Sequence, residues 1–245
     1  MSARRTWATA RRVAQQLRHD PRTIALLLVV PCVLQVLMHA LFTDSPQIFQ
    51  KLGVPLLGLF PFIAMFLVTS ITMLRERLSG TLERLLTTPI GRSDLLGGYG
   101  LSFAALAAVQ AIFVSALSFG LLGLKAGHST VAVMAIAIAN AVLGMALGLF
   151  ASAFARTEFQ AVQFMPALIL PQILLCGLIV PRDQMAGWLQ AISTVLPLTY
   201  AYDALAKLAS TDTLGARFWV DLVVIVGVTV LSLGLGAATL RRRTP

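Results

Sequence analysis

The chain has 245 residues, of which 58% are hydrophobic and 12% are charged, and its mean hydropathy is +0.84. Because soluble domains carry about a quarter charged residues, this composition excludes an ordinary soluble domain and indicates a membrane protein. The formal net charge is +9, but the basic residues flank apolar runs and form no basic groove interleaved with aromatics, so no nucleic-acid partner is expected.

Residues 1–22 have the pattern of an amphipathic helix that lies on the inner leaflet of a membrane. The predicted interface residues are Arg4, Arg5, Trp7, Arg11 and Arg12. Their guanidinium groups would contact anionic headgroups, so membrane lipid is an expected partner. Asp20-Pro21 would end this helix. A cleaved signal peptide is the alternative, which the long basic region and the span-length apolar run disfavour.

Seven intervals that lack Asp, Glu, Lys and Arg follow along the chain. They are residues 24–43, 52–74, 95–124, 126–155, 159–181, 184–202 and 222–240. A spanning helix needs about 20 apolar residues, so length alone would admit all seven. The interval 184–202 is the weakest, because it contains a central Pro197 and several polar residues. We expect it to form one or two short helices at the outer surface or dipping into it.

Charge placement predicts both termini in the cytoplasm and therefore an even number of spans. Positive residues mark the cytoplasmic side of a membrane. With six spans, six Lys and Arg lie in the N-terminal segment, four in 75–94, one at Arg156 and three at the C-terminus, which makes fourteen inside and leaves five outside. The resulting prediction is an all-α integral membrane protein with six transmembrane helices, an N-terminal amphipathic interfacial helix and short outer helices before the last span. Its parts are residues 1–22, a six-helix domain at 23–245, a cytoplasmic loop at 75–94 and an outer segment at 181–217.

Small residues and prolines within the intervals indicate how the helices pack. Gly144 and Gly148 form a GxxxG step that permits close helix approach, and we expect it to pack within the chain. Pro residues interrupt the second and fifth spans at positions 55, 61, 166 and 171. They predict bent helices, either as movable pathway walls or as static kinks.

Signals for catalysis are scarce. Ser102, in Gly100-Leu101-Ser102-Phe103, could belong to an intramembrane serine protease, but no histidine follows it on a later helix core to act as a base. The three histidines have no metal-ligand spacing, and no GxxxxGK[ST] motif occurs. Cys32 and Cys176 lie in apolar runs without CxxC spacing and are expected to be buried thiols. No catalytic site, metal or cofactor is expected in this chain.

Polar side chains inside the spans have two possible roles. They are Gln35, Thr69, Ser70, Gln110, Asn140, Gln163 and Gln172. Amides in a membrane usually form hydrogen bonds between helices. The alternative is a polar translocation path, for which the candidates are Gln110, Asn140, Gln163 and Gln172. No ionisable residue lies deep within a predicted span, so energy for transport is expected to come from elsewhere.

The charged stretch RERLSGTLERLL, at residues 75–86, is closed by Thr88-Pro89. It resembles the cytoplasmic loop of type 2 ABC exporter permeases, and most closely that of the daunorubicin-type drug and antibiotic permeases. The later run of Pro171, Gly177, Pro181, Trp188, Pro197 and Tyr200 is similar to the second signature region of that family. The sequence departs from the family pattern at Leu78, where an acid is frequent, and at Gly98-Tyr99, where a Gly-Lys is frequent.

This resemblance implies that two permease chains, identical or sister chains, pair with two copies of a separate ABC ATPase subunit that binds ATP and Mg. The loop of each permease would dock on its ATPase subunit through a short helix from about Ser79 to Leu86. The residues implied in this coupling are Glu76, Arg77, Gly80, Thr81, Leu82, Glu83, Arg84, Leu85 and Pro89. The structural alternative is a solvated loop whose arginines only set the topology.

The expected function is a permease subunit, without its own ATPase site, that exports a small amphipathic drug, antibiotic or lipid-like molecule across a bacterial-type plasma membrane. One alternative is a permease for a polysaccharide or lipid-linked glycan. That alternative would be expected to show a row of aromatic residues along the path, whereas aromatics make up 8% of this chain. A non-transporting membrane scaffold and an intramembrane enzyme are alternatives of a different class.

Overall fold

The computed structural model describes residues 2–81, 91–210 and 215–239, apart from the side chain of Arg92. Within these ranges every regular element is a helix, and six of them are long and apolar enough to cross a membrane. These six are α2 (Pro21–Leu41), α3 (Pro46–Leu78), α5 (Arg92–Gly120), α6 (Thr130–Ala151), α7 (Glu158–Leu175) and α10 (Ala216–Thr239). The prediction of an all-α membrane protein with six transmembrane helices is confirmed.

The remaining helices are shorter, and they lie before α2 and between α7 and α10. They are α1 (Ala3–Arg18), η1 (Arg182–Gln184), α8 (Gly187–Ser193) and α9 (Pro197–Ala209). This confirms the prediction that the interval 184–202 forms short helices and no span. The interval divides at Pro197, which begins α9. Proline suits the first position of a helix because the N–H that it lacks would have no partner there.

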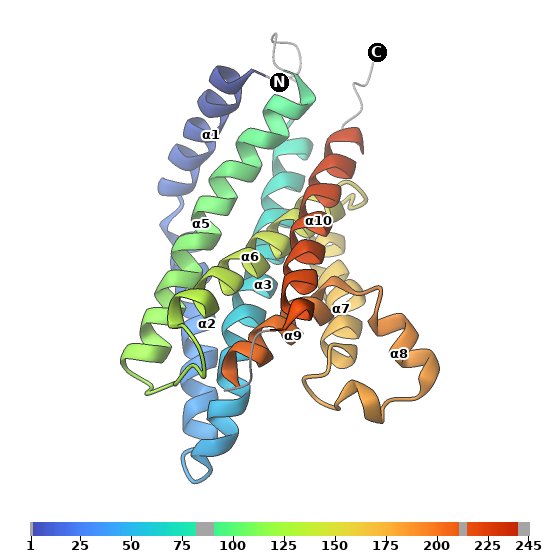
Figure 1. Ribbon diagram of the computed structural model, residues 1–245. Helices are drawn as coiled ribbons and strands as arrows, with labels where there is room; N and C mark the ends of the chain where they lie inside the picture. Colours follow the sequence, from blue (N-terminus) through green and yellow to red (C-terminus); the bar gives the residue numbers. More distant parts are fainter. Residues whose placement is uncertain (1, 82–90, 211–214, 240–245) are drawn as a thin grey trace.

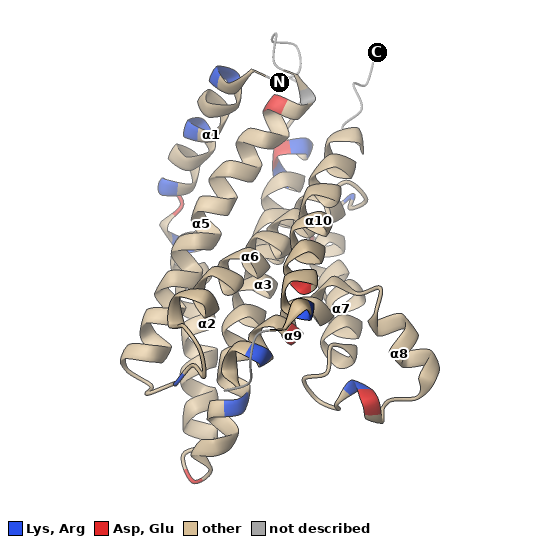
Figure 2. Ribbon diagram, in the orientation of Figure 1, with Lys and Arg blue, Asp and Glu red and all other residues tan. Residues whose placement is uncertain are grey.

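The two ends of the described chain lie at the same end of the helix bundle, as an even number of spans requires (Figure 1). The turn between α2 and α3 and the connection between α5 and α6 lie at the opposite end. Lys and Arg gather on α1 and on the neighbouring end of α3, and a smaller group lies at the opposite end (Figure 2).

The centre of the molecule is the contact between α3 and α6, where two glycines allow the backbones to touch. A Cβ atom at Gly144 would lie 2.3 Å from the carbonyl oxygen of Phe62, and one at Gly148 would lie 2.4 Å from that of Phe66. Thr69 adds a hydrogen bond from its hydroxyl to the Met145 carbonyl oxygen at 3.2 Å. The GxxxG step therefore packs within the chain, as predicted.

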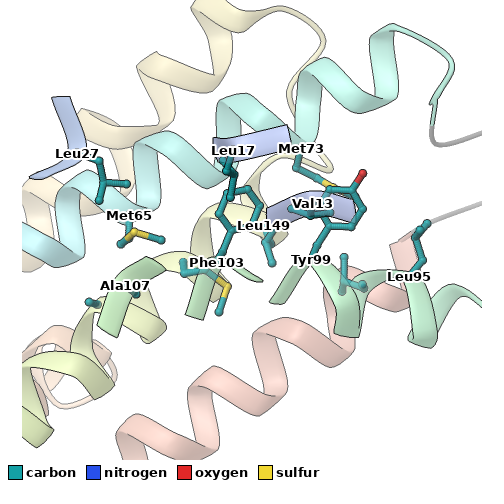
Figure 3. Close-up of a cluster of buried hydrophobic side chains, with 13 residues drawn as sticks. Val13, Leu17, Leu27, Met65, Met73, Leu95, Tyr99, Phe103, Ala107 and Leu149 are labelled. Atoms are coloured by element: carbon teal, nitrogen blue, oxygen red, sulfur yellow. The ribbon is translucent and has the colours of Figure 1, made fainter. Parts of the chain in front are cut away.

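One buried cluster joins the first helices to this centre (Figure 3). Val13 and Leu17 of α1 pack with Tyr99 and Phe103 of α5, and Leu149 of α6 completes the contact. Because α1 contributes buried side chains, it is part of the folded core. The two cysteines are also buried thiols, as predicted.

Several helices extend beyond the apolar intervals or stop short of them. The helix α3 covers the predicted interval 52–74 but begins at Pro46 and continues to Leu78. Arg75 and Arg77 therefore lie in its last turn, where positive charge interacts favourably with the helix dipole. The prolines at 55 and 61 lie inside α3, which continues through both positions.

The N-cap of α2 shows how a polar side chain fixes the start of a span. The Asp20 carboxylate accepts hydrogen bonds from the Thr23 hydroxyl at 2.6 Å and from the Thr23 backbone N–H at 3.2 Å. The hydroxyl bond and then the backbone bond hold the pKa of Asp20 below its usual value. This cap separates α1 from α2, as Asp20-Pro21 predicted.

Candidate functional site

The candidate site is the end of α3 together with the helices that hold it. The helix ends at the cap residue Ser79, whose N–H donates to the Arg75 carbonyl oxygen at 2.9 Å. Gly80 follows with φ +70°, the left-handed conformation that glycine adopts without steric cost. The Thr81 hydroxyl lies 2.9 Å from that of Ser79. Gly80 therefore sets the direction in which the chain leaves α3.

The other predicted coupling residues lie outside the described residues. They are Leu82, Glu83, Arg84, Leu85 and Pro89. The predicted short helix from about Ser79 to Leu86 is for this reason described only at its beginning.

Two arginines tie the end of α3 to the neighbouring spans. The Arg75 guanidinium donates two hydrogen bonds of 2.8 Å to the Glu158 carboxylate at the start of α7. Arg77 donates to the carbonyl oxygen of Ser152, the C-cap residue of α6, at 2.7 Å. A displacement of the α3 end would thus be transmitted to α6 and α7.

The helix α1 holds the same end of α3 from the other side. The Glu76 carboxylate accepts hydrogen bonds from Arg12 at 3.2 Å and from Gln16 at 3.1 Å. Arg12, which the sequence predicted at the lipid headgroups, lies instead at the contact between α1 and α3. The N–H of Ser2 donates to the Asp94 carboxylate at 2.7 Å. One helix therefore contacts the segment 75–94 near both of its ends.

The buried face of α1 includes polar side chains, and the predicted interface residue Trp7 lies outside it. Thr6 and Thr9 are buried, whereas Trp7 is 70% exposed. A Cβ atom at Gly98 would lie 2.5 Å from the Thr9 Cβ, so small side chains allow α1 to approach α5 closely. The Ser102 hydroxyl donates to the Ala10 carbonyl oxygen at 2.6 Å in this same contact. The exposed face carries the remaining predicted interface arginines Arg4, Arg5 and Arg11.

The four path candidates do not come together in one polar channel. Gln110 is fully buried and donates to the Leu27 carbonyl oxygen at 2.9 Å. Asn140 donates to that of Gly58 at 3.0 Å. These two amides thus form hydrogen bonds between helices, which is the packing role that the sequence left open beside a translocation path. Gln172 donates to Leu168 within its own helix at 2.9 Å, and Gln163 is exposed on α7.

An Asn140→Leu chain is expected to lose about 1 kcal/mol of stability, because Gly58 loses its interhelical donor within the membrane. The loss should appear as a lower melting temperature of the purified protein in detergent. The matched control is Gln163→Leu, which changes an exposed amide and should leave the melting temperature unaltered. A destabilisation of the same size in both variants would contradict the packing role of Asn140.

A cavity of about 340 Å³ opens between α3, α6 and α7. Its walls include the aromatic rings of Phe66, Phe150, Phe154 and Phe164, and Gln172 is the polar member of the lining. Such a lining suits an apolar or amphipathic molecule, which small-molecule sites bind through apolar walls and a few polar groups. Among the described residues, no cluster of His, Cys, Asp or Glu could hold a metal ion.

The opposite end contains charged pairs that sequence reasoning missed. Arg182 pairs with Asp203 of α9, and Lys207 donates to Asp221 of α10 at 2.5 Å. Asp221 was expected to precede the last span, but α10 begins at Ala216, so that its second turn contains this buried carboxylate. Burial raises the pKa of the Asp203 carboxyl, although Arg182 opposes this effect.

Comparison with known proteins agrees with these features. The sequence model of the ABC-2 type transporter family matches residues 4–209. The chain is 26% identical over 178 residues to the probable multidrug ABC transporter permease YbhS of Escherichia coli (strain K12), which covers 72% of this chain and 47% of that protein. It is 26% identical over 157 residues to the linearmycin resistance permease protein LnrN of Bacillus subtilis (strain 168), covering 64% of this chain and 40% of that protein. The chain spans about half of the length of these relatives or less.

Proposed function

Since the chain belongs to the ABC-2 type transporter family, we propose that it is the membrane-spanning subunit of an ATP-binding-cassette exporter for a small amphipathic drug, antibiotic or lipid-like molecule. The observation that carries the substrate class is the aromatic cavity between α3, α6 and α7, whose lining is almost wholly apolar. The names of the relatives, a multidrug permease and a linearmycin resistance permease, support the same class.

The energy would come from another chain. The sequence has no GxxxxGK[ST] motif to bind a nucleotide, so ATP and Mg would be bound by a separate ABC ATPase subunit, present in two copies. Two permease chains, identical or sister chains, would complete the transporter. The end of α3 and the segment that follows it would receive the motion of the ATPase. The ties of Arg75 to α7 and of Arg77 to α6 would pass that motion toward the walls of the cavity.

The direction of insertion is part of this proposal. The chain is a multi-pass membrane protein, and both of its termini would lie in the cytoplasm of a bacterial-type cell. The segments at the end of the bundle that holds the termini contain more Lys and Arg than the segments at the opposite end, which supports this orientation. The exposed Arg4, Arg5 and Arg11 would then face the anionic inner leaflet.

The test is to purify the chain from its native membrane, identify the ATPase that copurifies, and measure ATP hydrolysis by the complex in lipid nanodiscs. Amphipathic compounds are expected to stimulate hydrolysis several-fold. A Leu147→Trp change, which fills the cavity, should reduce this stimulation about tenfold. The matched control Leu231→Trp adds the same ring at an exposed position of α10 and should retain it.

Two outcomes would overturn the proposal. Stimulation by a lipid-linked glycan, and by no amphipathic compound, would identify a glycan permease. The absence of any copurifying ATPase would favour a non-transporting scaffold or an intramembrane enzyme.

A further inference from the structure

A second cleft lies at the end of the bundle opposite to the termini. It has a volume of about 660 Å³, within the range of small-molecule sites. It lies between the start of α3, the connection from α5 to α6, and α9. The polar residues of its lining are Gln47, Gln50, Lys51, Lys125, Tyr202 and Ser210.

The walls of this cleft are fixed by hydrogen bonds between separate elements. The Gln50 side chain donates to the Gly123 carbonyl oxygen at 3.0 Å and accepts from the Lys125 N–H at 2.8 Å. Further along the connection from α5 to α6, the N–H of Gly127 donates to the carbonyl oxygen of Leu208 in α9 at 3.1 Å. The backbone beside Lys125 is thus anchored to both α3 and α9.

Among the described residues, the charged members of the cleft lining are both positive. Lys51 and Lys125 both belong to its lining, and no carboxylate among the described residues does. Neither ammonium group forms an ion pair with a described residue, whereas the nearby Lys207 is paired with Asp221. Two lysines from different elements therefore face one space with no described negative charge to offset them.

We propose that this cleft binds a phosphate-type anion, carried by a lipid headgroup or free in solution. Lysine binds phosphate as a point charge, and the Gln47 amide and the Ser210 hydroxyl can add neutral donors. Lysine side chains at the ends of spanning helices reach toward the polar layer of the membrane, where lipid phosphates lie. The site is separate from the aromatic cavity, and its occupation does not depend on a partner ATPase.

The test is isothermal titration calorimetry with the full chain purified in a neutral detergent. The probes are dihexanoyl phosphatidic acid, dihexanoyl phosphatidylcholine and inorganic phosphate. Phosphatidic acid is expected to bind at least tenfold more tightly than phosphatidylcholine, whose headgroup has no net charge. The preference should weaken at about 0.5 M salt, because salt screens exposed charges.

The variant Lys51→Gln/Lys125→Gln removes both ammonium groups of the cleft and is expected to lower the affinity for phosphatidic acid at least tenfold. The matched control is Arg156→Gln/Arg217→Gln, which removes the same net charge at exposed positions outside the cleft and should bind like the unmodified chain. An unchanged melting temperature of both variants shows that they remain folded.

The arms of the experiment distinguish the sources of the anion. Competition by inorganic phosphate would support a site for the anion alone, and phosphatidic acid binding without such competition would support a lipid site. Equal binding of the two lipids, or equal affinity of the cleft variant and its control, would overturn the proposal. The titration involves neither ATP nor export, so its failure would leave the proposed exporter function untouched.

Discussion

A chain carrying Gly80→Pro is expected to insert into the membrane and fold, but to export at least tenfold less substrate. Gly80 has φ +70°, whereas the proline ring fixes φ near −65°. No atom lies within 4 Å of the position that a Cβ would take. The proline ring would also replace the N–H that Gly80 donates to the Arg77 carbonyl oxygen at 3.3 Å, so the effect comes from the backbone. The chain would leave α3 in a different direction and present the following segment wrongly to the ATPase.

The matched control is Gly80→Asn, since asparagine tolerates the left-handed conformation and would meet open space. Export and stimulated ATP hydrolysis are measured for both variants in one reconstituted complex. Glu83→Ala, at a position outside the described residues, is expected to uncouple export in the same way. Normal export by Gly80→Pro, with an unaltered ATPase rate, would show that the end of α3 does not couple the two subunits.

The second large effect is expected at Gly144, where an isoleucine should prevent the native contact between α3 and α6. Its Cβ would lie 2.3 Å from the Phe62 carbonyl oxygen, which is backbone and cannot rotate away. Overpacking of a core costs about 1–3 kcal/mol and occasionally more, and a clash with backbone belongs at the upper end. We expect little folded protein and a melting temperature lower by about 10 °C or more.

The control for this change is Gly227→Ile in α10, where a Cβ would meet no atom within 4 Å. Size-exclusion profiles and melting temperatures in detergent compare the two variants. Similar profiles and equal melting temperatures would mean that the two helices separate easily, in conflict with the central contact described above.

The spans could be predicted from the sequence because length and charge are properties of local segments. Six apolar helices and the short helices around Pro197 appeared where they were expected. The ends of α3 were less predictable. Its last turn contains Arg75 and Arg77. A search for uncharged intervals stops before these two residues, although positive charge favours the C-terminal end of a helix.

The partners of the site residues could not be predicted, because they are distant in the sequence. Glu76 and Arg12 are 64 positions apart, and their pairing depends on how α1 packs against α3. For Asn140 and Gln110 the sequence left two roles open, and the structure assigns both amides to carbonyl oxygens of neighbouring helices. The pair of Lys207 and Asp221 was missed because α10 begins before the uncharged interval does.

The packing of α1 on α5 has a consequence for biosynthesis. Ala10 and Ser102, which join the two helices, are 92 positions apart, so the first helix to be made must wait for its partner. At about 5–20 residues per second, this wait lasts roughly 5–20 s. During that time the face with Val13 and Leu17 lacks the cover that Tyr99 and Phe103 of α5 give it. An attraction of the exposed arginines to anionic lipid would keep the waiting helix at the membrane surface until α5 is in place.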